Sequence, residues 1–275
     1  MKTSRKYLQI LLYLVLILIC LLQCLPFYLA LNASLKPGTD LSSTIVPRLA
    51  DIEWENWGRA FTEGNILGAI LNSAIVTAIS TLLVCLIGAF AAYPLARRIT
   101  RFNKAVSAVI IAMMMIPPLS TLVPLYSMLV QMGAINTYWG IILVHTTGNL
   151  PLAIFLYTSF IKAIPTSVDE AGMIDGASSW RICVQLILPM LKPVTATVVI
   201  MSATNIWNEY ALSNYILADP NMQTIAPRVA SFFSANASSL GLAAASALMS
   251  AAPIVIVYLF LQKYFIAGMV AGVEK

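Results

Sequence analysis

The chain has 275 residues, 60% of them hydrophobic and only 10% charged, and its mean hydropathy is +0.86. A soluble globular domain carries charge on roughly a quarter of its residues, so this composition excludes that class and indicates a membrane protein. The formal net charge of +5 gives no support to nucleic-acid binding, because the lysines and arginines flank apolar segments, where membrane topology places them.

Six apolar segments are each long enough for a transmembrane helix, which needs about 20 residues. The first follows three basic residues but exceeds the apolar region of a signal peptide, about 7 to 15 residues, so we interpret it as an uncleaved anchor. Pro117, Pro118, Pro124 and Pro151 interrupt the third and fourth segments, and such kinks suit helices that surround a cavity. The expected helices cover residues 7–31, 66–95, 106–130, 139–161, 194–217 and 241–264.

Lysine and arginine indicate the orientation of these helices, because both accumulate on the cytoplasmic side of a membrane. With the amino terminus inside, twelve of these residues fall in inner segments and four in outer segments. We therefore expect a multi-pass protein of the cell membrane with both termini in the cytoplasm. The same topology divides the chain into an anchor helix with its outer loop, residues 1–65, and a five-helix core, residues 66–275, which carries a cytoplasmic loop at 162–192.

The longest polar interruption in the second half of the chain covers residues 167–193. Ser167 and Glu170 have the spacing of a capping box, in which each side chain accepts a hydrogen bond from a backbone N–H at a helix start. Gly176 should end this first helix because glycine tolerates a positive φ, and Ser178 or the next serine should cap a second helix. The expected unit is a helix, a glycine turn and a helix.

The fifth expected span carries Glu209, the only acidic residue within the six segments. A carboxylate at membrane depth costs a few kcal/mol unless it faces protein or water. Asn205, Asn208 and Glu209 lie at i, i+3 and i+4, so we expect them on one inward face, either as a packing network or as part of a translocation path. His145 in the fourth span has the same two interpretations, an interhelical hydrogen bond or a polar wall of the path.

The segment between the last two expected spans, residues 218–240, is long enough to form a contact surface outside the membrane. It contains Arg228, Phe232 and Phe233.

Motifs for catalysis and for bound cofactors are absent from the sequence. No G-x-x-x-x-G-K-[ST] segment is present, so the chain cannot form the loop that holds ATP phosphates. A single histidine and four cysteines without a C-x-x-C pair give no metal-binding pattern. We therefore predict a non-catalytic protein that itself binds no cofactor and no metal.

The polar loop resembles the signature loop of the permease subunits of ATP-binding-cassette (ABC) importers, whose pattern is E-A-A, three residues, G, nine residues and I-x-L-P. In this chain the pattern reads Glu170-Ala171-Gly172, then Gly176, then Leu186-Ile187-Leu188-Pro189. Gly172 stands where the family has alanine, and Leu186 where it has isoleucine. Other segments are similar to the carbohydrate branch of these permeases, the maltose-permease type: Asn56-Trp57-Gly58-Arg59-Ala60-Phe61, Asn72-Ser73, Trp207-Asn208-Glu209 and the tail 262–275.

This resemblance implies an all-α fold with six transmembrane helices of the type I importer kind, which forms one half of a pore for a sugar. The implied partners are a second, related permease, two copies of a cytoplasmic ATPase that binds ATP and Mg, and an extracellular solute-binding protein. The resemblance assigns the polar loop to the ATPase and the segment 218–240 to the binding protein. The residues concerned are Asp169, Glu170, Ala171, Gly172, Asp175, Gly176 and Ala177 for the ATPase, and Arg228, Phe232 and Phe233 for the binding protein.

Two alternatives stay open on the sequence. A permease for another solute, such as glycerol phosphate, an amino acid or a peptide, would carry the same loop. A channel or a membrane enzyme that works without an ATPase is the other alternative. The signature loop argues against it, and activity of the isolated chain would support it.

Overall fold

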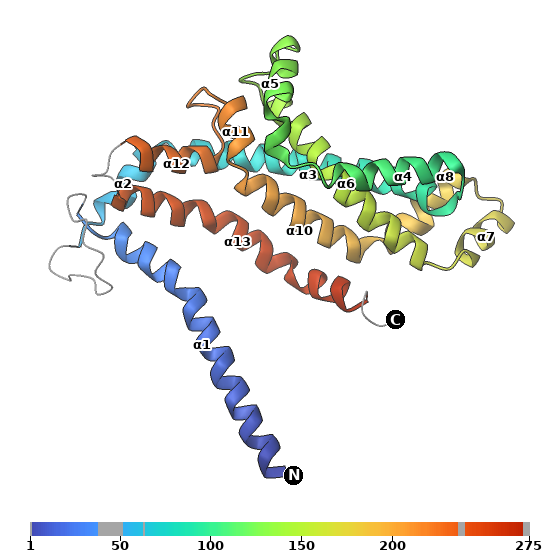
Figure 1. Cartoon of the computed structure of the whole chain (residues 1–275), viewed down its shortest axis with the longest axis horizontal. Coiled ribbons are helices and arrows are strands. Elements are labelled where there is room, and N and C mark those ends of the chain that lie inside the picture. Colours follow the sequence, from blue (N-terminus) through green and yellow to red (C-terminus); the bar gives the residue numbers. More distant parts are fainter. Residues whose placement is uncertain (1, 38–51, 63, 236–239, 272–275) are drawn as a thin grey trace. The chain divides into compact units, whose positions relative to one another are not determined.

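The computed structural model describes residues 2–37, 52–62, 64–235 and 240–271, and every regular element in these ranges is a helix (Figure 1). The all-α fold class is therefore confirmed for the described part of the chain. The helices are α1 (Lys2–Ser34), α2 (Glu55–Thr62), α3 (Ile66–Arg97), α4 (Arg101–Met113), η1 (Pro118–Thr121), α5 (Leu122–Gln131), α6 (Tyr138–Ala163), α7 (Ser167–Ile174), α8 (Ser179–Arg181), η2 (Ile182–Ile187), α9 (Leu188–Met190), α10 (Lys192–Asn208), α11 (Ala211–Ile216), α12 (Ile225–Ala235) and α13 (Leu240–Ala271).

Four of the described helices are long and apolar enough to cross a membrane, at Gln9–Ser34, Ile66–Arg97, Tyr138–Ala163 and Leu240–Phe260. Two further apolar segments are bent pairs: α4 meets the η1–α5 segment at 99°, and the α8–α9 segment meets α10 at 73°. The described residues thus provide four spans, or up to six if each bent pair is one span, which confirms a multi-pass protein. The first bend falls at Pro117 and Pro118, as expected, whereas α6 continues through Pro151.

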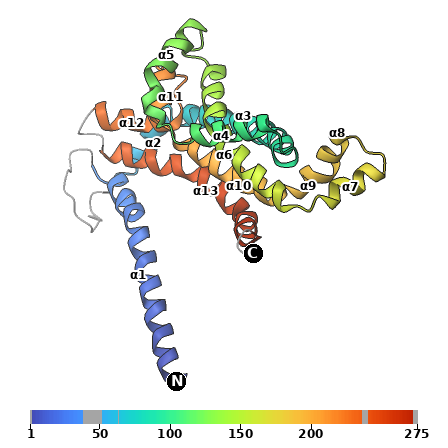
Figure 2. The same cartoon turned by 45° about the vertical axis from the view of Figure 1, so that its right-hand side comes forward.

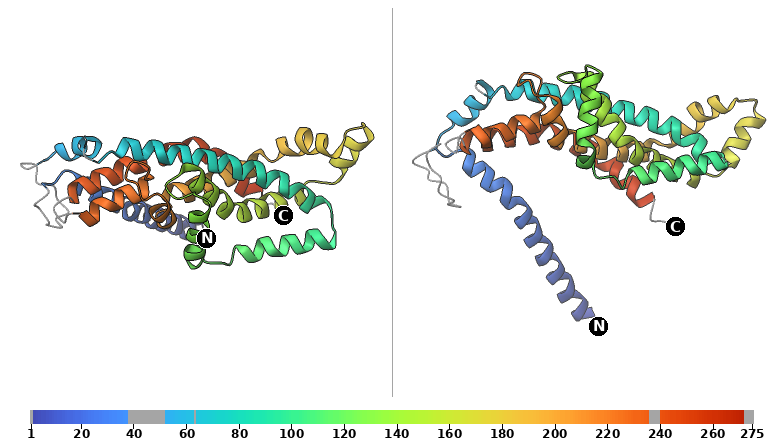
Figure 3. Two further views of the ribbon diagram at one scale, coloured as in Figure 1. Left: turned by 90° about the horizontal axis from the view of Figure 1, so that it is seen from above. Right: turned by 45° about the horizontal axis from the view of Figure 1, so that its top comes forward.

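One compact unit contains residues 68–227 and 253–275. Within it α6 packs against α10 and α4, and α6 and α10 lie side by side in Figures 1 and 2. The chain turns back after α3, so that α4 runs in the opposite direction (Figure 3). An apolar core joins α3, α6 and α10 to the π-helix η2. Its buried members include Val84, Ala89, Ala92, Ala153, Tyr157, Ile161, Ile182, Ile187, Val194 and Val198.

A polar clasp in the same unit fastens the segment after α11 to α3. The Asn72 amide donates to the carbonyl oxygens of Asn221 at 2.9 Å and Gln223 at 3.0 Å, and it accepts from the Tyr138 hydroxyl at 2.8 Å. The neighbouring Ser73 hydroxyl accepts from the backbone N–H of Ile225 at 2.7 Å. These bonds, one buried and three partly buried, satisfy backbone groups of an irregular segment and give Asn72 and Ser73 a definite structural role.

The second compact unit contains residues 1–67 and 228–252. Most apolar side chains of α1 between Ile10 and Leu29 are exposed, as side chains that meet lipid would be. Asn56 of α2 is buried and donates to the carbonyl oxygens of Ser34 at 3.1 Å and Lys36 at 2.8 Å. Asn56 therefore holds α2 against the end of α1.

Candidate functional site

The polar loop at 167–193 contains the expected glycine turn. Gly176 has φ +76°, and α7 ends with two hydrogen bonds of a Schellman motif: Gly176 N–H to Met173 O at 3.0 Å and Ala177 N–H to Gly172 O at 2.9 Å. The Ser178 hydroxyl then accepts from the Arg181 N–H at 3.3 Å and caps α8. The helix, glycine turn and helix are therefore confirmed, although the second helix includes the π-helix η2.

The predicted capping box at Ser167 and Glu170 is wrong. Thr166 is the N-cap residue of α7 and its side chain makes no capping hydrogen bond. The first backbone bonds of α7 instead reach the carbonyl oxygens of Pro165 and Thr166, because proline favours helical φ and lets the turn start before Ser167. Glu170 is exposed and free to face a partner.

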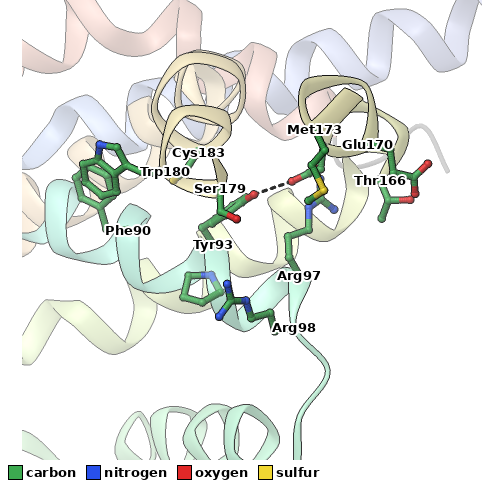
Figure 4. A pocket seen from close by; sticks show the side chains of 12 residues that line it. Phe90, Tyr93, Arg97, Arg98, Thr166, Glu170, Met173, Ser179, Trp180 and Cys183 are labelled. Carbon is green, nitrogen blue, oxygen red and sulfur yellow. Dashed lines mark hydrogen bonds and ion pairs between the residues drawn. The ribbon is translucent and has the colours of Figure 1, made fainter. Parts of the chain in front are cut away.

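Asp169 points away from the exposed side of α7 and forms a buried polar cluster with the last turn of α3. Its Oδ2 lies 2.7 Å from Arg97 Nη2, and its Oδ1 accepts from the Tyr93 hydroxyl at 2.8 Å. Arg97 Nη1 also donates to the carbonyl oxygen of Ile164 at 3.0 Å, just after α6. Figure 4 shows Tyr93 and Arg97 directed from α3 towards the loop. The Arg97 guanidinium thus links its own helix α3 to α7 and to the residue that follows α6.

The predicted coupling residues fall on two sides of the loop. Asp169 and Gly172 are buried, Ala177 is half-buried, and Glu170, Ala171, Asp175 and Gly176 are exposed. A Cβ atom on Gly172 would lie 2.9 Å from Ile182 Cγ1 and 3.0 Å from Leu186 Cδ1, so α7 packs closely on the second helix where the family has alanine. The exposed side also carries two apolar side chains, Met173 and Ile174, with Ile174 86% exposed.

A cavity of about 500 Å³ lies between the end of α3 and the polar loop (Figure 4). Its wall includes the rings of Phe90 and Trp180, which are stacked with centroids 5.1 Å apart and an interplanar angle of 12°. Arg97, Arg98 and Glu170 supply charge to the same wall. The stack joins α3 to α8 as the Arg97 cluster joins α3 to α7.

Glu209 does not share one helical face with Asn205 and Asn208. Helix α10 ends at Asn208 and α11 begins at Ala211, so the expected helix over 194–217 is interrupted at Glu209, which precedes Tyr210, the N-cap residue of α11. Its carboxylate accepts from the N–H groups of Leu212 at 2.7 Å and Ser213 at 2.9 Å, and from the Ser213 hydroxyl at 2.8 Å. A carboxylate fits here because it meets the positive end of a helix.

His145 and the two asparagines occupy different surroundings. His145 is buried on α6, and its Nε2 lies 3.4 Å from the Ser213 hydroxyl, so it meets the Glu209 cluster through that serine. Asn205 and Asn208 are exposed on α10, and the Asn208 amide donates to Thr204 O at 2.9 Å. The structure brings His145 and Glu209 together and separates the asparagines from them. A role in translocation stays a prediction for all four.

The predicted contact residues for the binding protein lie on α12. The Arg228 guanidinium donates through Nε to Gly64 O at 2.7 Å and lies 5.8 Å above the Phe232 ring. Phe232 is half-buried, whereas Phe233 is 57% exposed. Of the three, Phe233 offers the largest free apolar surface.

Sequence reasoning missed the partners on α3. Tyr93 and Arg97 are four residues apart at the end of an expected span, so they share a helical face, and this spacing was the available signal. Nothing in the sequence pattern paired that face with Asp169, which lies 76 residues after Tyr93.

Comparison with known proteins places these features in one family. The family described as "Binding-protein-dependent transport system inner membrane component" matches residues 85–270. The chain is 45% identical over 253 residues to the melibiose/raffinose/stachyose import permease protein MelC of Bacillus subtilis (strain 168), an alignment that covers 91% of each protein. It is 33% identical over 256 residues to the multiple sugar-binding transport system permease protein MsmG of Streptococcus mutans serotype c, again with 91% of each protein covered.

A solved structure supports the fold. The crystal structure of a bacterial ABC transporter involved in the import of the acidic polysaccharide alginate matches with a TM-score of 0.81, covering 95% of this chain and 98% of that one. The sequence identity is 20%, so this likeness speaks for the fold alone. The resemblance to the carbohydrate branch of importer permeases is confirmed by the sugar permeases among the sequence relatives. The chain belongs to the family of binding-protein-dependent transport system inner membrane components.

Proposed function

We propose that this chain is the transmembrane permease subunit of an ATP-driven, binding-protein-dependent importer of sugars or oligosaccharides. The observation that carries the proposal is the 45% identity to MelC across 91% of the chain. The oligosaccharides in the name of that relative, melibiose, raffinose and stachyose, are accordingly the first candidate solutes. The sugar permeases among the relatives favour a sugar over the alternatives from the sequence, which were glycerol phosphate, amino acids and peptides.

The proposed topology has six spans, of which the fifth follows the polar loop and begins near residue 194, with both termini in the cytoplasm. The lysine and arginine distribution supports this orientation, because twelve of these residues then lie inside and four outside. The anchor region 1–65 and the core 66–275 remain the proposed division of the chain. In this orientation the polar loop projects into the cytoplasm.

The proposed partners are a second permease, two ATPase subunits and an extracellular binding protein. ATP and Mg belong to the ATPase, because this sequence has no phosphate-binding loop. The exposed side of α7 supports docking to a groove, since Met173 and Ile174 present apolar surface beside the charged Glu170 and Asp175. We propose that this side of α7 binds in a groove of the ATPase, while Asp169 on the opposite side attaches the helix to α3.

The solute path and the contact with the binding protein are both proposed from exposed side chains. Asn205 and Asn208 supply exposed amide groups on α10 that can donate to and accept from a hydroxyl-rich solute. Glu209 and His145 contact α11 instead, so their proposed role is to hold that helix in place. Phe233 is the proposed contact with the binding protein, because its ring is exposed on α12.

Uptake of labelled raffinose tests the function directly. Cells that lack this chain should lose raffinose uptake, and expression of the chain should restore it. Competition with unlabelled glycerol phosphate, amino acids and peptides should leave uptake unchanged, and depletion of ATP should abolish it. Uptake of raffinose or melibiose that does not depend on the chain would overturn the sugar assignment, and uptake that survives ATP depletion would favour a channel.

A further inference from the structure

Helices α7 and α3 are far apart along the chain. Along the chain it follows α6 and precedes the α8–α10 segment, whereas α3 ends 70 residues before α7 begins, at Arg97 and Ser167 respectively. Any displacement of α7 therefore reaches α6 and α10 through the backbone. In space, α7 meets the end of α3 through the side chains of Tyr93, Arg97 and Asp169.

The polar part of these contacts is the Arg97 cluster, formed by Arg97, Tyr93 and Asp169. Both oxygens of the Asp169 carboxylate have a partner on α3: Oδ2 forms an ion pair with Arg97 Nη2 at 2.7 Å, without the alignment of a hydrogen bond, and Oδ1 accepts a hydrogen bond from the Tyr93 hydroxyl at 2.8 Å. The two charged side chains are 12% and 8% exposed, so bulk water does not screen the pair as it screens a surface ion pair. Arg97 also holds Ile164 O, and its charge suits the negative end of α3.

The cavity beside the cluster does not have the character of an anion site. Arg97 and Arg98 are balanced in its wall by Asp169 and Glu170, so no net positive charge faces the space. The apolar contacts around it indicate instead that this region attaches the loop to α3. Phe90 stacks on Trp180 of α8, and Gly172 brings α7 within contact of Ile182. Together these contacts fix both helices of the loop to the end of α3 and to each other.

We propose that Arg97 and Asp169, with Tyr93, form the link through which movement of α7 is transmitted to α3. This inference rests on the proposed function, in which the exposed side of α7 is seated in the ATPase. The three residues are positioning residues, since they touch neither the solute nor the nucleotide. When the ATPase moves α7, the pair pulls the end of α3 with it, so that the pathway opens in step with ATP hydrolysis.

The test uses the intact complex, purified through a tag on this chain and reconstituted in proteoliposomes. The measured quantity is the number of ATP molecules hydrolysed per molecule of labelled raffinose imported, at equal ATPase content. Asp169→Asn removes the charge and should raise this ratio at least about fivefold, the lower end of common coupling effects. Tyr93→Phe deletes one hydroxyl and should raise it by a smaller factor. Arg98→Gln is the matched control, because Arg98 is exposed at the next position, and it should leave the ratio unchanged.

A double variant separates transmission from simple stability. Arg97→Met with Asp169→Leu leaves no unpaired buried charge, and apolar replacements of this kind often restore stability. Thermal stability of the complex should therefore recover in the double variant while the ATP-to-raffinose ratio stays high. A double variant with a wild-type ratio would overturn the link, because stability alone would then explain the single variants.

The remaining outcomes also decide. If Asp169→Asn loses the ATPase during purification, Tyr93→Phe takes its place, and a wild-type ratio in Tyr93→Phe counts against the link. If Glu170→Ala uncouples transport while Asp169→Asn and Tyr93→Phe keep the wild-type ratio, the link is wrong and the proposed function stands. If Glu170→Ala and Asp169→Asn both transport normally, ATPase coupling through this loop is wrong as well.

Discussion

The glycine turn after α7 permits a test in which strain is the only variable. Gly176 has φ +76° and no atom lies within 4 Å of the position that a Cβ would take. A substitution there therefore creates no clash, and its whole effect comes from backbone conformation. Alanine in the left-handed region costs about 1 to 2 kcal/mol, and a β-branched residue reaches about 3 kcal/mol.

These costs translate into populations of the turn. A cost of about 1 kcal/mol shifts the equilibrium between the native turn and its alternatives about fivefold, and about 3 kcal/mol shifts it more than 100-fold. Asparagine tolerates positive φ better than most residues, so its effect should be the smallest. The expected order of defects is therefore Gly176→Asn, then Gly176→Ala, then Gly176→Val. The defect is a loss of coupled transport, because the turn sets the direction in which α7 presents Glu170.

Gly133 supplies a matched control. It has φ +66°, again with no atom within 4 Å of a Cβ, and it lies in the turn between α5 and α6. Gly133→Val should destabilise the chain by a similar amount without changing retention of the ATPase. The assays are labelled raffinose uptake in cells and the ATPase content of the purified complex. Equal loss of ATPase in both valine variants, or wild-type uptake in Gly176→Val, would refute the reasoning.

Three further predictions follow from the contacts. Asn72→Asp removes the amide that holds Asn221 O and Gln223 O, so it should destabilise the clasp by about 1 to 3 kcal/mol and expose residues 218–224 to limited proteolysis, which Asn149→Asp should not do. Cysteines placed at 205 and 208 should react with a water-soluble maleimide faster than one placed at 209, and equal rates would contradict the capping role of Glu209. The purified chain alone should not be photolabelled by an ATP analogue, and labelling would contradict the assignment of ATP to a partner.

The long spans could be predicted because length and apolarity determine them locally. The expected helices at 66–95 and 139–161 differ by only a few residues from Ile66–Arg97 and Tyr138–Ala163. The glycine turn was equally local, since the hydrogen bonds around Gly176 join residues only three to five positions apart. Such features need no knowledge of what packs against them.

The interactions of the two carboxylates, Asp169 and Glu209, could not be predicted in the same way. The spacing of Ser167 and Glu170 favoured a capping box, but Pro165 starts the helix earlier and Asp169 takes a partner 76 residues away along the chain, Tyr93. Periodicity likewise continued the fifth span through Glu209, whereas the structure ends α10 at Asn208. Both differences arise where a charged side chain binds a distant residue or the N–H groups of a helix start, which a pattern of local spacing does not predict.

The two carboxylates also bear on how this chain handles a neutral solute. Asp169 is balanced by a guanidinium, and Glu209 by the N–H groups at the start of α11 and the Ser213 hydroxyl. Glu209 thus accepts three hydrogen bonds from the protein, so few of its acceptor sites remain for a sugar hydroxyl. The exposed amides of Asn205 and Asn208 retain that capacity. In the proposed path these neutral amides would hold hydroxyl groups without attracting counterions. It follows that Glu209→Gln should lower the stability of α11 and leave the affinity for solute nearly unchanged. Asn205→Ala should lower the affinity for solute and leave the stability of α11 nearly unchanged.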